Sequence, residues 1–142
     1  MIWLLRHGDA EEGSDDDARR LTEKGRAQGE VAGRALAALG AAPDACLSSP
    51  KARAVEMAEL ACKPLGLEVE TTDALAGGDF DPRELAAGRG DVLLVGHEPD
   101  FSNAIARLTG AEVEMKKGGL ACIDGYTLIA LLRPDQLALI AR

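Results

Sequence analysis

The sequence contains two histidines, and both follow the end of an apolar segment. His7 comes after the run at residues 2–5 and Arg6, and His97 comes directly after the run DVLLVG at residues 91–96. Continuous apolar runs of this length are typical of strands that are buried on both faces of a sheet. In open α/β sheets, ligands bind at the carboxyl ends of the strands. We therefore expect both imidazoles at one ligand-binding edge.

Two arginines are expected at the same edge. Arg6 precedes His7, and Arg53 lies near the start of a predicted helix, where free backbone N–H groups and the helix dipole favour an anion. Guanidinium groups match the oxygens of a phosphoryl group, and a neutral imidazole can donate a hydrogen bond or attack as a nucleophile. The four side chains therefore predict an oxyanion site that fits phosphate best, with His7 as the group that takes up the phosphoryl.

Each of these residues also has a plainer interpretation. A histidine at a strand end is more often a hydrogen-bonded structural residue, and a strand-end arginine is usually a surface ion pair. The more specific alternative to an oxyanion site is a metal site. Its third ligand would have to come from Asp9, Glu98 or an acidic loop, and the two arginines would repel the cation. We expect neither a metal nor another cofactor.

The elements that must position these residues alternate along the chain. Strands are predicted at residues 2–5, 45–48, 67–70 and 91–96. Helices are predicted at residues 23–39, 50–62 and 99–108, with one further turn near 82–86. A terminal hairpin is predicted from residues 120–123 and 126–132. The pattern predicts an α/β fold, a three-layer α/β/α sandwich with a largely parallel sheet and an antiparallel edge.

Capping residues support the first two helices. Thr22 is placed as the N-cap of the first helix, and Gly40 ends it. Ser49 is placed as the N-cap of the second helix and Pro50 as its first residue, where the missing proline N–H costs nothing. The acidic stretch at residues 11–17, before the first helix, is expected to be a loop.

Composition narrows the class of protein. The chain has 142 residues, which fits one domain (residues 1–142) without a sizeable lid. Its three cysteines are widely separated and predict neither a disulfide framework nor a zinc site. A net charge of −8 without a basic run argues against nucleic-acid binding. The opening apolar run is too short for a signal peptide and no stretch can span a bilayer, so we expect a cytoplasmic protein.

Five segments of the chain resemble, in the same order, segments of the histidine phosphatase superfamily. They are LLRHGDA (4–10), LTEKG (21–25), SSPKARA (48–54), VGHEPD (95–100) and KKGGLA (116–121). The short RHG motif is a moderate signal by itself, whereas five ordered matches that span most of the chain are specific. In its small size, its RHGDA motif and its late KKGG segment, the chain most resembles the SixA-type phosphohistidine phosphatases.

The resemblance implies a phosphoglycerate mutase-like fold and a metal-independent phosphatase. Residue by residue, it implies that His7 is the nucleophile. It further implies that Arg6, Arg53 and His97 bind and polarise the phosphoryl group, and that Gly8 lets the backbone approach it closely.

One part of the family pattern is missing from this chain. Many members carry an acidic proton donor between the third and fourth strands, but here Leu75 is followed by Ala-Gly-Gly at residues 76–78. Asp79 or Asp81 could reach into the site, although turn and helix-cap roles explain both more simply. An imidazole departs from phosphohistidine more readily than an alkoxide departs from an ester. The gap therefore favours a phosphoramidate substrate, such as phosphohistidine.

We therefore expect a phosphatase that acts on phosphohistidine through a phospho-His7 intermediate. Its partner is a phosphorylated protein or small molecule, and neither nucleic acid nor membrane. A small-molecule phosphomonoesterase, with Asp79 or Asp81 as the acid, stays open as an alternative, and so does the oligomeric state. A phosphate-binding regulatory module without turnover is the third possibility, and the presence of both histidines and both arginines argues against it.

Overall fold

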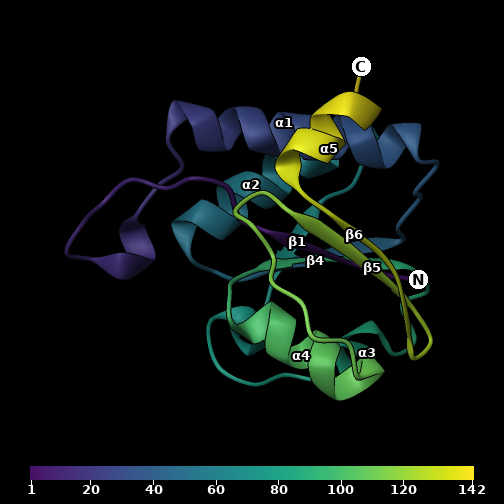
Figure 1. Ribbon diagram of the computed structural model, residues 1–142. Helices are drawn as coiled ribbons and strands as arrows, with labels where there is room; N and C mark the ends of the chain where they lie inside the picture. The colour runs from purple at the N-terminus through teal and green to yellow at the C-terminus, as the bar shows by residue number, and fades with distance from the viewer.

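The computed structural model describes residues 1–142, and a six-stranded sheet forms its centre (Figure 1). The strands are β1 (Ile2–Arg6), β2 (Ala45–Ser48), β3 (Val69–Thr71), β4 (Val92–Gly96), β5 (Leu120–Asp124) and β6 (Thr127–Leu132). Their order across the sheet is β3-β2-β4-β1-β5-β6. The first four strands in this order are parallel, and β5 and β6 are antiparallel to their neighbours. The predicted parallel sheet with an antiparallel edge is confirmed.

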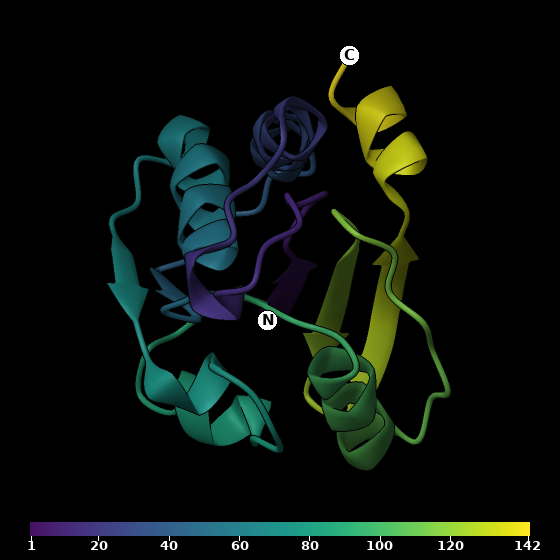
Figure 2. The same ribbon diagram turned by 90° about the vertical axis from the view of Figure 1, so that its left-hand side faces the viewer.

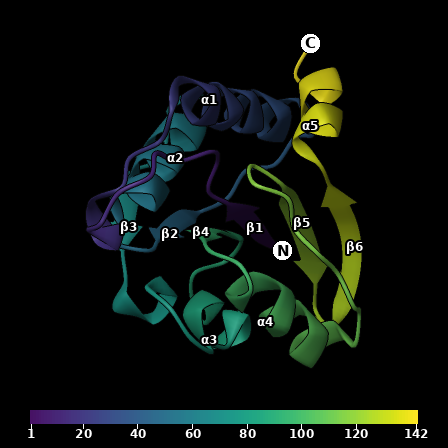
Figure 3. The same cartoon turned by 60° about the vertical axis from the view of Figure 1, so that its left-hand side comes forward.

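Helices cover both faces of the sheet and complete three layers (Figures 1 and 3). The face shown uppermost carries α1 (Glu23–Ala38), α2 (Ala52–Cys62) and α5 (Pro134–Ile140). The opposite face carries α3 (Pro82–Ala86) and α4 (Asp100–Thr109). Figure 2 shows the same separation from another side. None of these helices has the length and apolar character that a membrane span requires.

The start of α1 is built as the sequence predicts, and it packs closely on its neighbours. Thr22 Oγ1 accepts the backbone N–H of Gly25 at 3.1 Å, which is an N-cap. A Cβ at Gly33 would lie 2.7 Å from the carbonyl oxygen of Ala61 in α2, and a Cβ at Gly25 would collide with the carbonyl oxygen of Asp9. Glycine at these positions therefore lets α1 lie directly against α2 and against the segment that follows β1.

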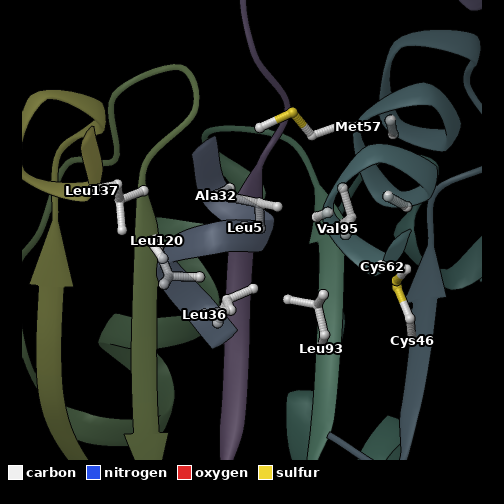
Figure 4. Packing of buried hydrophobic residues seen from close by; sticks show 14 of the residues in the cluster. Leu5, Ala32, Leu36, Cys46, Met57, Cys62, Leu93, Val95, Leu120 and Leu137 are labelled. Atoms are coloured by element: carbon white, nitrogen blue, oxygen red, sulfur yellow. The ribbon is translucent and has the colours of Figure 1, made fainter. Parts of the chain in front are cut away.

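Two hydrophobic clusters fill the spaces between the layers. Leu5 points into the cluster beneath α1 and α2, and Leu4 points into the cluster above α4, because successive side chains of a strand face opposite sides. Figure 4 shows the first cluster, in which strand and helix residues meet: Leu5, Leu36, Met57, Leu93, Val95 and Leu120. The central strands β1 and β4 are thus packed on both faces, which holds their carboxyl ends in place.

One helix and three short 3₁₀ turns are absent from the predicted pattern. Helix α5 begins at Pro134, and the Gln136 side chain accepts the backbone N–H of Arg133 at 2.9 Å, so both helix-start signals are present. The acidic stretch, expected to be a loop, contains one 3₁₀ turn at Asp16–Ala18. Further 3₁₀ turns lie at Lys63–Leu65 and Asp73–Leu75.

Candidate active site

The carboxyl ends of β1 and β4 lie side by side in the middle of the sheet. Arg6 is opposite Gly96 in the parallel register, and the backbone N–H of His7 donates to the carbonyl oxygen of Gly96 at 3.1 Å. His97 follows Gly96 directly, and the centroids of the two imidazole rings are 5.2 Å apart. The sheet backbone therefore brings the two histidines together, as the edge rule predicts.

One ring nitrogen of His7 is unprotonated and presents a lone pair. Its Nδ1 lies 2.7 Å from the carbonyl oxygen of Gly8 and must carry the proton, because a carbonyl oxygen only accepts. Its Nε2 accepts the Nε–H of Arg53 at 3.4 Å. Burial, followed by the charges of Arg53 and Arg6, lowers the pKa of His7 from 6.5 to about 4. At neutral pH the imidazole is therefore neutral, with Nε2 available as a nucleophile.

Gly8 is required for packing against α1. A Cβ on Gly8 would lie 2.7 Å from Gln28 Oε1 and 2.9 Å from the carbonyl oxygen of Gly25. Gln28 Oε1 also accepts the backbone N–H of Asp9 at 2.8 Å. The close approach that glycine permits is thus an approach to α1, and Gly8 is not among the residues that line the site cavity.

Arg53, in the first turn of α2, is held by the acidic segment. Its Nη1 donates to the carbonyl oxygen of Asp16 at 2.7 Å, and its Nη2 donates to the Asp16 carboxylate at 3.3 Å. Lys51 Nζ and Arg19 Nη1 donate to the same carboxylate at 3.0 and 3.1 Å. Hydrogen bonds from Lys51 and Arg19, and then from Arg53, hold the pKa of Asp16 well below its usual value. Asp16 therefore aligns three cations along one wall of the site.

His97 makes its one hydrogen bond to the protein through Nε2. This nitrogen lies 2.8 Å from Ser49 Oγ, whereas Nδ1 is buried without a hydrogen-bond partner. Burial, followed by the interactions with His7 and Arg53, lowers the pKa of His97 from 6.5 to about 3. Like His7, the ring is neutral at neutral pH.

The role of Ser49 differs from the predicted one. Its hydroxyl accepts the backbone N–H of Lys51 at 3.2 Å and contacts His97, so it forms a short turn rather than the helix cap. Helix α2 consequently begins at Ala52, two positions after the predicted start at Pro50.

Arg6 completes the cluster from the end of β1. Its Nη1 donates to the carbonyl oxygen of Met115 at 2.8 Å, which fixes the guanidinium, and its Nε is buried without a partner. Burial lowers the pKa of Arg6, but arginine starts so high that it stays charged at neutral pH. A buried donor without a partner on a charged group is suited to an anionic ligand.

A cavity of about 370 Å³ opens over these side chains. Both histidines line it, together with five cations: Arg6, Arg19, Lys51, Arg53 and Lys117. Two carboxylates, Glu98 and Asp100, also line it. Glu98 is engaged, because its oxygens accept the backbone N–H groups of Ser102 at 2.7 Å and Met115 at 3.2 Å. The excess of positive charge favours a multiply charged anion, such as a phosphoryl group, beside His7.

The two aspartates considered as proton donors are not among the residues that line this cavity. Asp79 pairs with Arg107 of α4 at 3.2 Å. Asp81 Oδ1 accepts the backbone N–H of Arg83 at 2.9 Å and caps α3. The segment at residues 76–78, where the family pattern places a donor, lines the cavity with alanine and glycine.

Several charged residues of the site are not among those the sequence predicts, including Asp16, Arg19, Lys51 and Asp100. Lys51 lies two positions before Arg53 in the SSPKARA motif, so a basic residue at that spacing is a usable signal. The contact between Asp16 and Arg53 joins residues 37 positions apart, and no local pattern indicates it.

Known proteins share sequence with a large part of this chain. Residues 2–89 match the Histidine phosphatase superfamily (branch 1). An uncharacterised protein of Picosynechococcus is 34% identical over 134 residues, which cover 84% of this chain and 81% of that protein. The mitochondrial serine/threonine-protein phosphatase Pgam5 of Drosophila melanogaster is 39% identical over 70 residues, or 49% of this chain. That match spans about a quarter, 24%, of the length of Pgam5.

Solved structures share the fold. The protein histidine phosphatase SixA in complex with tungstate has a TM-score of 0.82 and 24% identity, and the alignment covers 96% of this chain and 98% of that one. The phosphoserine phosphatase of Entamoeba histolytica has a TM-score of 0.71 and 16% identity, with coverage of 96% and 98%. The implied phosphoglycerate mutase-like fold is confirmed. With the sequence match over residues 2–89, the chain belongs to the histidine phosphatase superfamily.

Proposed function

We propose that the protein is a phosphatase that removes the phosphoryl group of phosphohistidine through a covalent phospho-His7 intermediate. The observation that carries this proposal is the state of His7. Its Nδ1–H donates a hydrogen bond to the carbonyl oxygen of Gly8. The lone pair of its Nε2 faces Nε of Arg53 at 3.4 Å, inside a cavity lined by cationic side chains. A neutral imidazole nitrogen is a nucleophile, and the adjacent guanidinium is suited to phosphoryl oxygens. Membership of the superfamily supports the same chemistry.

The reaction proceeds in two phosphoryl transfers. In the first, His7 Nε2 attacks phosphorus in line with the leaving group. The substrate enters with the second nitrogen of its phosphorylated imidazole already protonated from solvent. An N–P bond to His7 forms while the N–P bond to the substrate breaks, and the substrate leaves as a neutral imidazole that takes the bonding electrons and keeps that proton. In the second, water attacks the phosphorus of phospho-His7. The N–P bond breaks with its electrons returning to His7 Nε2, and the proton lost by the water passes to solvent, which leaves inorganic phosphate and neutral His7. Arg6, Arg53 and His97 hold the phosphoryl oxygens in both steps.

The walls of the cavity support phosphohistidine as the substrate. Residues 76–78 contribute no acid, and Asp79 and Asp81 are engaged in a salt bridge and a helix cap. Glu98 is also engaged, because its carboxylate accepts two backbone N–H groups. Apart from Asp100, the cavity holds no free carboxyl group that could serve as a proton donor, and this suits an imidazole leaving group better than an alkoxide.

The charge of the cavity supports catalysis without a metal ion. Five lysine and arginine side chains line it, and their charges would repel a divalent cation from the region around His7. The same charges do the work that a metal would otherwise do, because they neutralise the phosphoryl oxygens as negative charge develops.

A second candidate function is hydrolysis of small phosphate monoesters. The observation that favours it is Asp100, a carboxylate in the first turn of α4 that lines the cavity. If Asp100 protonates an alcohol as it leaves, the same nucleophile serves an ester substrate.

The test is turnover by the purified protein with EDTA present. A phosphohistidine peptide and a panel of phosphate esters are offered to the wild type and to His7→Ala, and released phosphate is measured. We expect the peptide to be the preferred substrate and the variant to be inactive. Melting temperatures of both proteins show whether the variant is folded.

Each other outcome contradicts a part of the proposal. Undiminished turnover by His7→Ala excludes the nucleophile, and loss of wild-type turnover in EDTA excludes metal-independent catalysis. Preference for an alkyl phosphate favours the monoesterase. Binding of phosphate without any turnover favours a regulatory module.

A further inference from the structure

The hydroxyl of Ser49 touches His97 in the interior of the site. Ser49 is fully buried, His97 is 7% exposed, and Ser49 Oγ lies 2.8 Å from His97 Nε2. The mechanism proposed above makes no use of this contact. The contact nevertheless bears on which ring nitrogen of His97 carries the proton, because a neutral imidazole has one N–H and one lone pair.

The hydrogen-bonding capacity of the hydroxyl sets the direction of this bond. A serine hydroxyl donates one hydrogen and accepts through two lone pairs. Ser49 Oγ already accepts the backbone N–H of Lys51 at 3.2 Å, and among its contacts His97 Nε2 is the one acceptor for its own proton. A buried hydroxyl that donates to Nε2 requires a lone pair there, which places the imidazole proton on Nδ1.

We infer that Ser49 is a positioning residue that holds His97 in the tautomer with the proton on Nδ1, so that Nδ1–H donates to a phosphoryl oxygen. Nδ1 of His97 is buried and has no hydrogen-bond partner in the protein, and the His97 side chain lines the cavity. A phosphoryl oxygen supplies the missing acceptor. The inference rests on the proposed function, because the phosphoryl group is the ligand that completes the hydrogen bond.

The opposite tautomer would be unfavourable at two places. With the proton on Nε2, the Ser49 hydrogen would lose its acceptor in a fully buried position. Nδ1 would then present a lone pair to an anionic ligand, which repels it. A donor at this position is instead most useful in the transition state, when the phosphoryl oxygens carry the most charge.

The tautomer can be read directly by ¹⁵N NMR. The chain has two histidines, so a His7→Gln variant assigns both rings. In the wild type without ligand, above about pH 5, we expect His97 to show a protonated Nδ1 and an unprotonated Nε2. Ser49→Ala should give a mixture of tautomers. Protonation of Nε2 in the wild type, or an unchanged spectrum in Ser49→Ala, would overturn the inference.

Kinetics provide the second readout. Loss of a group that orients a reacting side chain typically lowers activity by about 10- to 100-fold, and we expect Ser49→Ala to lower kcat for phosphohistidine by this factor while KM changes less. Ser49→Thr retains a hydroxyl and should recover most of the activity. An equal loss in the threonine variant would contradict a role for the hydroxyl.

Ser48→Ala is the matched control. Ser48 is also fully buried, but its hydroxyl donates to the carbonyl oxygen of Ser49 at 2.9 Å rather than to a histidine. We expect its tautomer spectrum to equal that of the wild type. The spectra also separate the two proposals: a protein without phosphohistidine turnover refutes the proposed function while the spectrum still tests Ser49. An active protein with Nε2 protonated refutes only the role of Ser49.

Discussion

His7 and His97 stand at the ends of neighbouring parallel strands, and each makes one short hydrogen bond through a ring nitrogen. At the end of β1, Nδ1–H of His7 donates to the carbonyl oxygen of Gly8, and the lone pair of Nε2 faces Arg53. At the end of β4, Nε2 of His97 is hydrogen-bonded to the Ser49 hydroxyl, and Nδ1 is buried without a hydrogen-bond partner. In the proposed mechanism, this difference in hydrogen-bond partner makes His7 the nucleophile and His97 the hydrogen-bond donor, although residue type, burial and strand position are alike.

The largest expected effect comes from replacing one ring or the other. His7→Gln should lose turnover by about 10⁴-fold or more and form no phosphoenzyme, because the nucleophile is gone. His97→Gln should keep forming the phosphoenzyme and lose about 10²- to 10³-fold, as expected when one donor to the transition state is removed. Radiolabelled phosphohistidine peptide, quenched in alkali, measures the intermediate. Radiolabel covalently bound to the His7→Gln protein would contradict the assignment of His7, rather than His97, as the nucleophile.

The second effect is a shift in proton affinity that both rings share. NMR titration should give midpoints near the pKa of about 4 for His7 and about 3 for His97, below the ordinary 6.5, because burial disfavours the charged ring. A midpoint near 6.5 for either ring would show that it is solvated and would break the likeness between the two strand ends.

The same shifts make the fold sensitive to acid. Between the lowered pKa values and 6.5 the unfolded chain binds more protons than the folded one, so stability rises with pH across that window. Stability should therefore be lost as the pH falls from 6.5 towards 4. Melting temperatures at pH 7 and pH 4 check this, and the difference should shrink in His7→Gln and in His97→Gln.

A smaller effect on kcat/KM is expected from Asp16, which acts on the His7 side of the site through Arg53. Asp16 holds Arg53, which contacts His7, so Asp16→Ala should lower kcat/KM by about tenfold through a misplaced guanidinium. The neighbouring Asp17 is more exposed and only approaches Lys51, at 4.0 Å. Asp17→Ala is the control and should change kcat/KM by less than about twofold. Equal effects of the two substitutions would remove Asp16 from the positioning of Arg53.

The smallest effect is expected at Asp79 and Asp81. Neither lines the cavity, and both make structural contacts, so Asp79→Asn and Asp81→Asn should change turnover of phosphohistidine by no more than about twofold. Steady-state kinetics with the phosphohistidine peptide measure this. A loss of tenfold or more in either variant would show that the two histidines act with an acid from the α3 segment.

The sequence predicts the central sheet and the meeting of its polar residues well, for physical reasons. The apolar runs before His7 and His97 are too continuous for a half-exposed strand, and parallel strand ends must share one edge of a sheet. Arg53 follows because a helix after β2 starts at that edge. These predictions need only local patterns and one topological rule.

Other parts of the site depend on contacts that no local pattern contains. The position of Ser49 before a helix is typical of a cap, but its hydroxyl turns to a histidine 48 residues away. Asp16 lies in a stretch whose acidity predicts a solvated loop, and its role depends on where α2 places Arg53. Helix α5 is short and begins at Pro134, and its N-cap residue is Arg133 rather than a serine or aspartate, so the commonest cap signal is missing although Pro134 and Gln136 are present.

The register that sets Arg6 opposite Gly96 has a consequence for how this site can change. A slip of one residue between β1 and β4 would turn one imidazole to the opposite face of the sheet, since side chains alternate along a strand. The hydrogen-bonded pairing of β1 with β4, rather than the conformation of loops, therefore sets the distance between the two rings. Insertions between the elements can therefore accumulate without disturbing the pair, whereas an insertion within β1 or β4 would separate the rings at once.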